Sequence, residues 1–294
     1  LAAKGRFGGA WEHAQAAVKS EPAEAEYHHA LGGIHEATRR FEQAAQSLAN
    51  FINLLPNGVR DDRAVWARAE LRFLRSFGSR APYEFLSDPN QVYVLPFKEV
   101  NEKIIVRGKV NGEEMDFVVD TGAELAVVSA QTAQRRGVDP VTYTVSAGVG
   151  AVGLRGLQLA RVDRLEFGAL RLRNVPVIIK NPPLKDLPAA ETESVSPLAF
   201  GLSMVVDYKA GQITLARNLP AEAAAPDVVL PLWMHRLATV RGLVDDKHAA
   251  TFVVDTGGQV ISISTTTAES LMRPETGRRI ALKVYGTSGW DPDA

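Results

Sequence analysis

Two identical hexapeptides, Phe-Val-Val-Asp-Thr-Gly, are the part of this sequence best suited to chemistry. They occupy residues 117–122 and 252–257, so Asp120 and Asp255 are 135 residues apart. If an internal duplication brings the two carboxylates together, both cannot ionise easily, and the pair shares one proton. One carboxylate then acts as a base toward a bound water, while the other donates a proton to the carbonyl under attack. The motif therefore predicts acid–base hydrolysis without a metal, a cofactor or a covalent intermediate.

The duplication extends beyond the hexapeptides. Residues 96–133 align with residues 231–268 without a gap, and Ser129 recurs as Ser264. A lone Asp after an apolar run is most often a turn or helix-capping residue, but this simpler interpretation does not account for the common register. Two apolar residues before each Asp predict a buried strand, and Thr and Gly after it permit a tight turn. We therefore expect one site per chain, on a pseudo-twofold axis.

Residues 1–78 have the composition of helices, rich in Ala, Glu, Gln and Arg. A 34-residue period closed by Pro is typical of helix-turn-helix solenoids, and residues 23–56 resemble one tetratricopeptide repeat. A third helix, residues 61–77, would cap the stack with Trp66, Leu71 and Leu74 facing inward. A plain helical hairpin with accidental periodicity is the alternative. The pairs that repeat with this period are Phe7/Phe41, Ala10/Ala44, Val18/Ile52 and Pro22/Pro56.

From residue 92 the sequence changes to short strands rich in Val, Ile and Leu, separated by Gly and Asn turns. A linker of Gly, Ser, Pro and Asp, residues 79–91, separates this all-β region from the helices. A second linker, residues 219–227, divides the region into residues 92–218 and 228–294. Asn111-Gly112 predicts a hairpin turn. The expected strands are 103–110, 115–119, 158–166, 175–179, 204–207 and 212–216, with one short helix at 130–136.

The overall composition is ordinary for a globular protein. The chain has 294 residues, 46 % of them apolar and 23 % charged, with a net charge of −1. Because the charges are spread along the chain, nothing indicates a nucleic-acid or anionic-membrane partner. The absence of Cys excludes disulfides, thiol nucleophiles and Cys-based zinc sites. No apolar run approaches the roughly 20 residues that span a bilayer. Since the chain begins at Leu1 and stops early in the second copy, we expect the natural protein to continue at both ends.

In its two hexapeptides, the chain from residue 91 onward resembles the retropepsin-like aspartic peptidases, arranged as two lobes in one chain. The resemblance also covers Ser129 and Ser264 and the close of the first lobe, where residues 205–208 lead to residues 213–215. It implies two pseudo-twofold-related β-barrel lobes corresponding to the two β regions, the second one partial. The fold class is therefore expected to be a helical repeat solenoid followed by two acid-protease lobes.

The resemblance assigns roles to residues of this sequence. Asp120 and Asp255 would form the catalytic dyad. The Thr of each copy would hydrogen-bond across the lobe interface and hold the dyad rigid, and the Gly of each copy would let the backbone approach the substrate. These supporting residues are Thr121, Gly122, Thr256 and Gly257.

The family also has a β-hairpin flap over its cleft, which would correspond here to residues 146–153. Its substrate-facing residues would be Gly148, Val149, Gly150 and Ala151, and the glycines suit a mobile hairpin. The spacing Gly-x-Gly-x-x-Gly also fits a phosphate-binding loop. No helix and no Lys-Ser/Thr pair follows, however, so the flap is favoured.

The sequence departs from the family pattern in three places. Family members carry two apolar residues and a Gly before the last helix of each lobe, whereas residues 193–197 contain no Gly. The usual Ala after the triplet is present as Ala123 but replaced by Gly258 in the second copy. By analogy with the first lobe, the second lacks some 60 residues, and a half lobe would leave a sheet edge and apolar side chains uncovered.

These observations predict an aspartic endopeptidase that acts on a peptide or protein substrate. The alternative is a non-catalytic module that binds a peptide in the cleft, although two intact Asp-Thr-Gly triplets argue against it. Helical repeats form concave protein-binding surfaces, so residues 1–78 are expected to bind a protein partner or to mediate self-association. The resemblance favours a bacterial protein that is exported or periplasmic over a cytoplasmic one.

Overall fold

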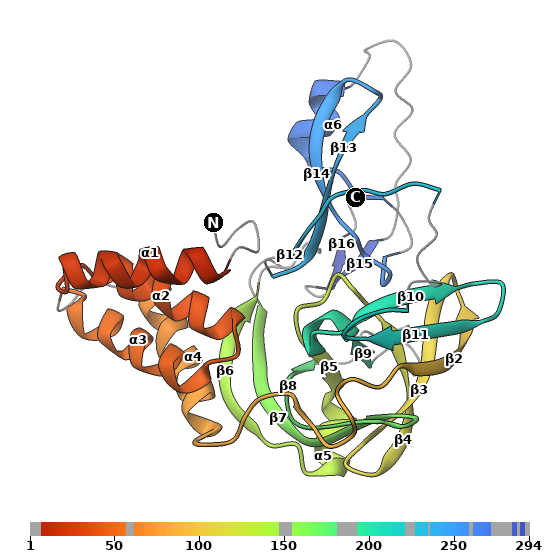
Figure 1. Ribbon diagram of the computed structural model, residues 1–294, viewed down its shortest axis with the longest axis horizontal. Coiled ribbons are helices and arrows are strands. Elements are labelled where there is room, and N and C mark those ends of the chain that lie inside the picture. Colours follow the sequence, from red (N-terminus) through yellow and green to blue (C-terminus); the bar gives the residue numbers. More distant parts are fainter. Residues whose placement is uncertain are drawn as a thin grey trace.

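Four helices form the N-terminal part of the molecule and lie together at one end of it (Figure 1). The computed structural model describes residues 7–56, 62–146, 155–180, 193–220, 227–234, 236–258, 261–271, 284–286 and 289–291. Each helix packs against the next along the chain. The helices are α1 (Phe7–Ser20), α2 (Ala25–Ala37), α3 (Phe41–Leu54) and α4 (Asp62–Ser76).

The helical core is built from side chains of α3, of α4 and of the turn after α4. Leu74 is buried there, and Trp66 and Leu71 pack against it half-buried, as expected for the inner face of the last helix. The 34-residue period corresponds to helix starts, because Phe7 begins α1 and Phe41 begins α3. The tetratricopeptide assignment itself stays a prediction. None of the helices in the described part of the chain is long and apolar enough to cross a membrane.

An 11-stranded sheet forms the β domain in the middle of the chain. Its strand order is β10-β11-β2-β3-β4-β9-β5-β8-β7-β6, β1 pairs with β8, and a further pairing of β3 with β7 closes the sheet on itself. The bounds are β1 (Glu84–Phe85), β2 (Tyr93–Val100), β3 (Lys103–Val110), β4 (Glu113–Val119), β5 (Ala126–Ser129), α5 (Ala130–Arg136), β6 (Pro140–Ser146), β7 (Arg155–Phe167), β8 (Leu170–Lys180), β9 (Ser194–Val195), the 3-10 helix η3 (Pro197–Phe200), β10 (Ser203–Asp207) and β11 (Gln212–Ala216).

The barrel interior is dry and aromatic. Phe117 and Phe167 meet edge to face at 5.1 Å between ring centroids, and Phe200 is 1 % exposed beside them in the same core. The β3–β4 hairpin turns at Asn111-Gly112, as predicted, with φ values of 46° and 90° that suit Asn and Gly.

The third part of the chain repeats the start of the β domain. It contains β12 (Leu232–Met234), β13 (Ala238–Val244), β14 (His248–Val253), α6 (Thr265–Leu271), β15 (Val284–Gly286) and β16 (Gly289–Asp291). Helix α6 lies 135 residues after α5 and has the same length, and β13 begins 135 residues after β3. In the described residues these strands form a three-stranded and a two-stranded sheet, not a second closed sheet.

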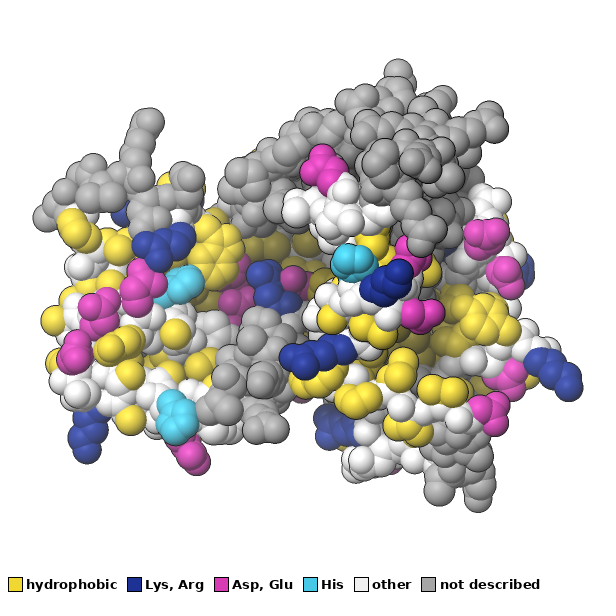
Figure 2. Space-filling model, turned by 90° about the horizontal axis from the view of Figure 1, so that it is seen from above, with side chains coloured by type: hydrophobic (Ala, Val, Ile, Leu, Met, Phe, Trp, Pro, Cys, Tyr) yellow, Lys and Arg dark blue, Asp and Glu magenta, His cyan; other side chains and the backbone are white. Residues whose placement is uncertain are grey.

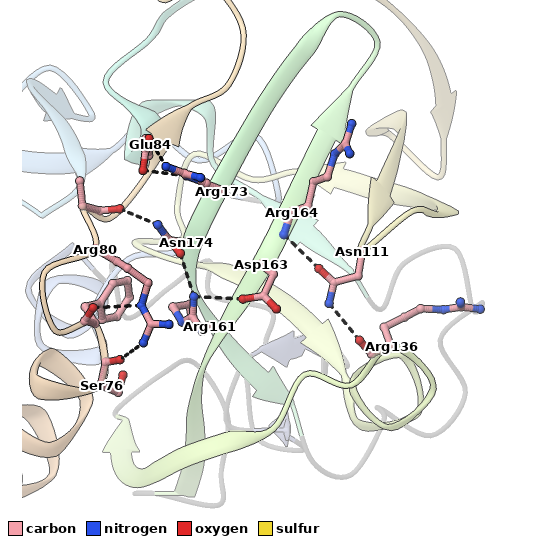
Figure 3. Close-up of polar contacts among 12 residues, drawn as sticks. Ser76, Arg80, Glu84, Asn111, Arg136, Arg161, Asp163, Arg164, Arg173 and Asn174 are labelled. Carbon is pink, nitrogen blue, oxygen red and sulfur yellow. Dashed lines mark hydrogen bonds and ion pairs between the residues drawn. The ribbon is translucent and has the colours of Figure 1, made fainter.

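The segment expected as a linker, residues 79–91, packs on the β domain. It contains β1 and the buried Tyr83, whose amide donates to the Asn174 carbonyl at 3.2 Å. Figure 3 shows the polar seam: Asn174 donates to the Ala81 carbonyl and accepts a hydrogen bond from Arg161 at 2.8 Å. Because its backbone and side chains are bonded to β7 and β8, this segment fixes the helices to the barrel instead of tethering them loosely.

The helices and the barrel also share apolar core. Leu159 of β7 is buried in the helical core, and Ile178 of β8 and Leu125 pack against it. Arg39, in the turn between α2 and α3, donates from Nη2 to the Ala199 carbonyl of η3 at 2.8 Å. The β6 strand that completes this face was not expected from the sequence.

Candidate active site

Strands β4 and β14 carry the two Asp residues. Asp120 directly follows β4, and its amide donates to the Val195 carbonyl at 2.9 Å. Asp255 follows Val254, whose amide donates to the Ala238 carbonyl at 2.9 Å. Each carboxylate therefore lies at the end of a strand whose last amides are already paired, as the apolar run before each triplet predicted.

The Thr residues of the two triplets bond to each other's strands. Thr121 Oγ1 donates to the Val254 carbonyl at 2.5 Å, and Thr256 Oγ1 donates to the Val119 carbonyl at 2.7 Å. In return, the Thr256 amide donates to Thr121 Oγ1 at 3.1 Å, and the Thr121 amide donates to Thr256 Oγ1 at 3.2 Å. Because each hydroxyl both donates and accepts, these four bonds fix the position of one triplet against the other.

The Gly residues of the triplets make room for the opposite carboxylate. A Cβ atom on Gly122 would lie 2.5 Å from Asp255 Cγ, and one on Gly257 would lie 2.6 Å from Asp120 Cγ. Their amides also hold the carboxylates, since Gly122 donates to Asp120 Oδ1 at 3.0 Å and Gly257 donates to Asp255 Oδ1 at 2.8 Å. The glycines thus allow the two carboxylates to approach, a role the sequence analysis did not give them.

The environments of the two carboxylates differ. Asp120 is half-buried, whereas Asp255 is exposed. Burial, the charge of Asp255 and a hydrogen bond with Asp255 raise the pKa of Asp120 from 3.8 to about 6, against smaller opposing effects of the Gly122 amide and Lys103. Asp120 therefore keeps its proton through mildly acidic pH, which suits a pair that holds one proton between two carboxylates.

A buried carboxylate, Glu193, supports the strand end behind Asp120. It is 4 % exposed and accepts from the Ser129 amide at 3.1 Å, from Ser129 Oγ at 2.9 Å and from Thr132 Oγ1. The next two residues form β9, which lies between β4 and β5. The segment that lacks the family's Gly therefore still fills its place in the sheet, and Glu193 ties it to the start of α5.

Replacing Glu193 with Gln should lower the free energy of unfolding by about 2–3 kcal/mol, because an amide NH₂ would face one of the donors that the carboxylate now accepts from. Urea unfolding measures this change. Glu114→Gln, at an exposed position of β4, is the control and should change stability by less than about 0.5 kcal/mol. Equal effects of the two substitutions would contradict the role given to Glu193.

An ion pair missed by the sequence analysis lies beside the dyad. Arg236 donates from Nε to Glu124 Oε2 at 2.8 Å, and its Nη2 lies 2.6 Å from the same oxygen. Glu124 is four residues after Asp120, whereas Arg236 lies between β12 and β13, so the pair joins the β domain to the third part of the chain. The position of Glu124 was a possible signal, but no spacing rule pointed to its partner.

The expected flap residues, Gly148, Val149, Gly150 and Ala151, lie outside the described residues. The strands on either side of them, β6 and β7, pair antiparallel up to Ser146 and Arg155. Within the described part of the chain, no group of three or more His, Asp or Glu residues is arranged to hold a metal ion.

Comparison with known proteins bears on the β domain. Residues 106–187 match the family described as "gag-polyprotein putative aspartyl protease". The β domain is retropepsin-like in fold. The match includes Asp120, and Asp255 lies beyond it. Among solved structures, a retropepsin-like aspartic protease from Rickettsia conorii is similar, with 15 % sequence identity and a TM-score of 0.32, over 45 % of this chain and 94 % of that chain. The comparison with curated proteins gave no match.

The retropepsin-like domain accounts for one Asp-Thr-Gly triplet, and the third part of the chain supplies the other. The β domain contributes Asp120 and its support from β9, while β14 contributes Asp255. A site with both carboxylates thus needs both parts of this one chain.

Proposed function

We propose that this protein is an aspartic endopeptidase whose two catalytic carboxylates, Asp120 and Asp255, come from pseudo-symmetric halves of a single chain. The observation that carries the proposal is the mutual bonding of Thr121 and Thr256, which holds the two triplets together. The family match to residues 106–187 supports aspartic protease chemistry for the first half. An extended peptide or protein is the substrate.

The mechanism follows from the unequal carboxylates. Asp120, with its raised pKa, holds the shared proton and donates it toward the carbonyl oxygen of the scissile bond. Asp255 takes a proton from the bound water, which attacks the carbonyl carbon. The tetrahedral intermediate then collapses as the nitrogen of the leaving amine receives a proton from the dyad. The threonine bonds keep both carboxylates in place through these steps.

The test is digestion of a proteome-derived peptide library with the protein and with the double variant Asp120→Asn/Asp255→Asn. New peptide termini should accumulate with the wild type and stay at background with the double variant. Cleavage that persists in the variant would rule out the dyad, and binding of peptides without cleavage at any pH from acid to neutral would favour the non-catalytic alternative.

A further inference from the structure

A hollow between the helical domain and the β domain has acidic and basic side chains in it (Figure 2). Glu36 of α2 and Glu70 of α4 approach the ion pair of Glu124 and Arg236 from the helical side, because the charges of these four groups act on one another. Three carboxylates therefore converge with one arginine, about one short loop away from Asp120.

Glu70 has no partner for its charge. It is 7 % exposed, and within the described residues it makes no hydrogen bond or ion pair; the half-buried Glu36 makes none with its carboxylate either. The equally buried Glu193, in contrast, accepts from a backbone amide and two hydroxyls. A buried carboxylate without donors is unfavourable, so natural proteins keep few of them away from functional sites.

The nearby arginines are already engaged. Arg236 gives both Nε and Nη2 to Glu124. Arg39 donates to the Ala199 carbonyl and lies over the Tyr83 ring at 5.1 Å from its centroid. The groups facing Glu70 from other elements are thus two further carboxylates and a cation bound to one of them.

The electrostatics of the cluster favour an added cation. Burial raises the pKa of Glu36 to about 7 and that of Glu70 to about 8; Arg236 lowers both pKa values, while Glu124 raises both. A positive group placed between the two carboxylates would restore their charged forms and supply the missing donors.

We propose that Glu36 and Glu70 recognise a lysine or arginine side chain of the substrate, at the end of the cleft marked by Glu124. The inference rests on the proposed peptidase function. It is supported by the place of Glu124, four residues beyond Asp120, because an extended peptide over the dyad advances about 3.3 Å per residue and reaches this side within a few residues of the scissile bond. The helical domain would then contribute directly to substrate choice.

The experiment compares peptides that differ only in Lys or norleucine at successive positions around a cleaved bond. At one position, the full-length wild type should prefer Lys, and the ratio of kcat/KM for Lys over norleucine should fall about tenfold or more in Glu36→Gln/Glu70→Gln. Glu42→Gln, an exposed position at the start of α3, is the matched control and should keep the wild-type ratio. Equal ratios in wild type and double variant at every position would overturn the proposal.

A binding measurement separates this inference from the peptidase function. Fluorescence anisotropy of labelled Lys and norleucine peptides, with the non-cleaving Asp120→Asn protein, should show the same Lys preference and its loss when Glu36 and Glu70 are also changed. Lys-selective binding without any cleavage by the wild type would uphold the recognition site and reject the peptidase. If the double variant does not fold, as judged by thermal unfolding, Glu36→Gln alone carries the comparison.

Discussion

Replacing Asp120 with Asn should reduce kcat/KM by at least about a thousandfold, because the dyad loses the carboxyl group that holds its proton. In the wild type, kcat/KM should fall as the pH rises through about 6, where Asp120 loses that proton and the dyad becomes doubly charged. A pH profile of peptide cleavage measures both effects. Asp116→Asn on the same strand removes only a surface ion pair with Arg107 and should retain the wild-type profile.

The same substitution should stabilise the protein at high pH. The folded state raises the pKa of Asp120 from 3.8 to about 6, so folding favours its neutral form, and the wild type loses stability as the pH rises from about 4 to 6. Asn stays neutral, so Asp120→Asn should raise the free energy of unfolding by roughly 2 kcal/mol at pH 8 and change it little at pH 4. Denaturant unfolding at the two pH values is the measurement. A variant that is less stable than the wild type at pH 8, or a profile that is flat from pH 5 to 8, would contradict the assignment.

Replacing Thr121 with Val should lower the free energy of unfolding by about 2–3 kcal/mol. The two side chains have the same shape, but Val leaves the Val254 carbonyl without its donor and the Thr256 amide without its acceptor. Thr121 is 3 % exposed, so water does not easily replace these partners. We expect kcat/KM to fall by more than tenfold as well, since the two carboxylates lose their fixed geometry.

Hydrogen exchange gives a local measure of this substitution. The Thr256 amide, which donates to Thr121 Oγ1 in the wild type, should exchange faster in Thr121→Val by NMR. Thr121→Ser keeps the hydroxyl and serves as the control, so it should retain most of the protection and activity. If Val and Ser behave alike, the hydroxyl bonds do not hold the triplets together.

The sequence predicted the elements that carry the site where the signals were local. Helix α5 has its expected bounds because Ser129 caps it by accepting from the Thr132 amide and Gly137 ends it with φ at 62°. The 135-residue register predicted that α6 would follow in the same place, and it predicted the meeting of Asp120 and Asp255, whose triplets bond across the axis.

Contacts between distant segments could not be predicted in the same way. Glu193 binds Ser129, 64 residues earlier, and Arg236 binds Glu124 across 112 residues, with no repeat or spacing rule to connect them. The segment at residues 79–91 reads as a linker because it is rich in Gly, Pro and Asp, yet Tyr83 is buried against the barrel. Composition reports local backbone preference, whereas this packing depends on the surfaces of β7 and β8.

The core shared by the helices and the barrel has a consequence for how such a protein changes through evolution. Leu159 and Ile178 turn apolar side chains outward from the sheet only because helices cover them, and Leu125 does so five residues from Asp120. A descendant that lost the helices would have to acquire polar residues at these positions at the same time, one of them next to the reaction centre. Helices and catalytic domain are therefore inherited together and do not exchange freely as independent modules.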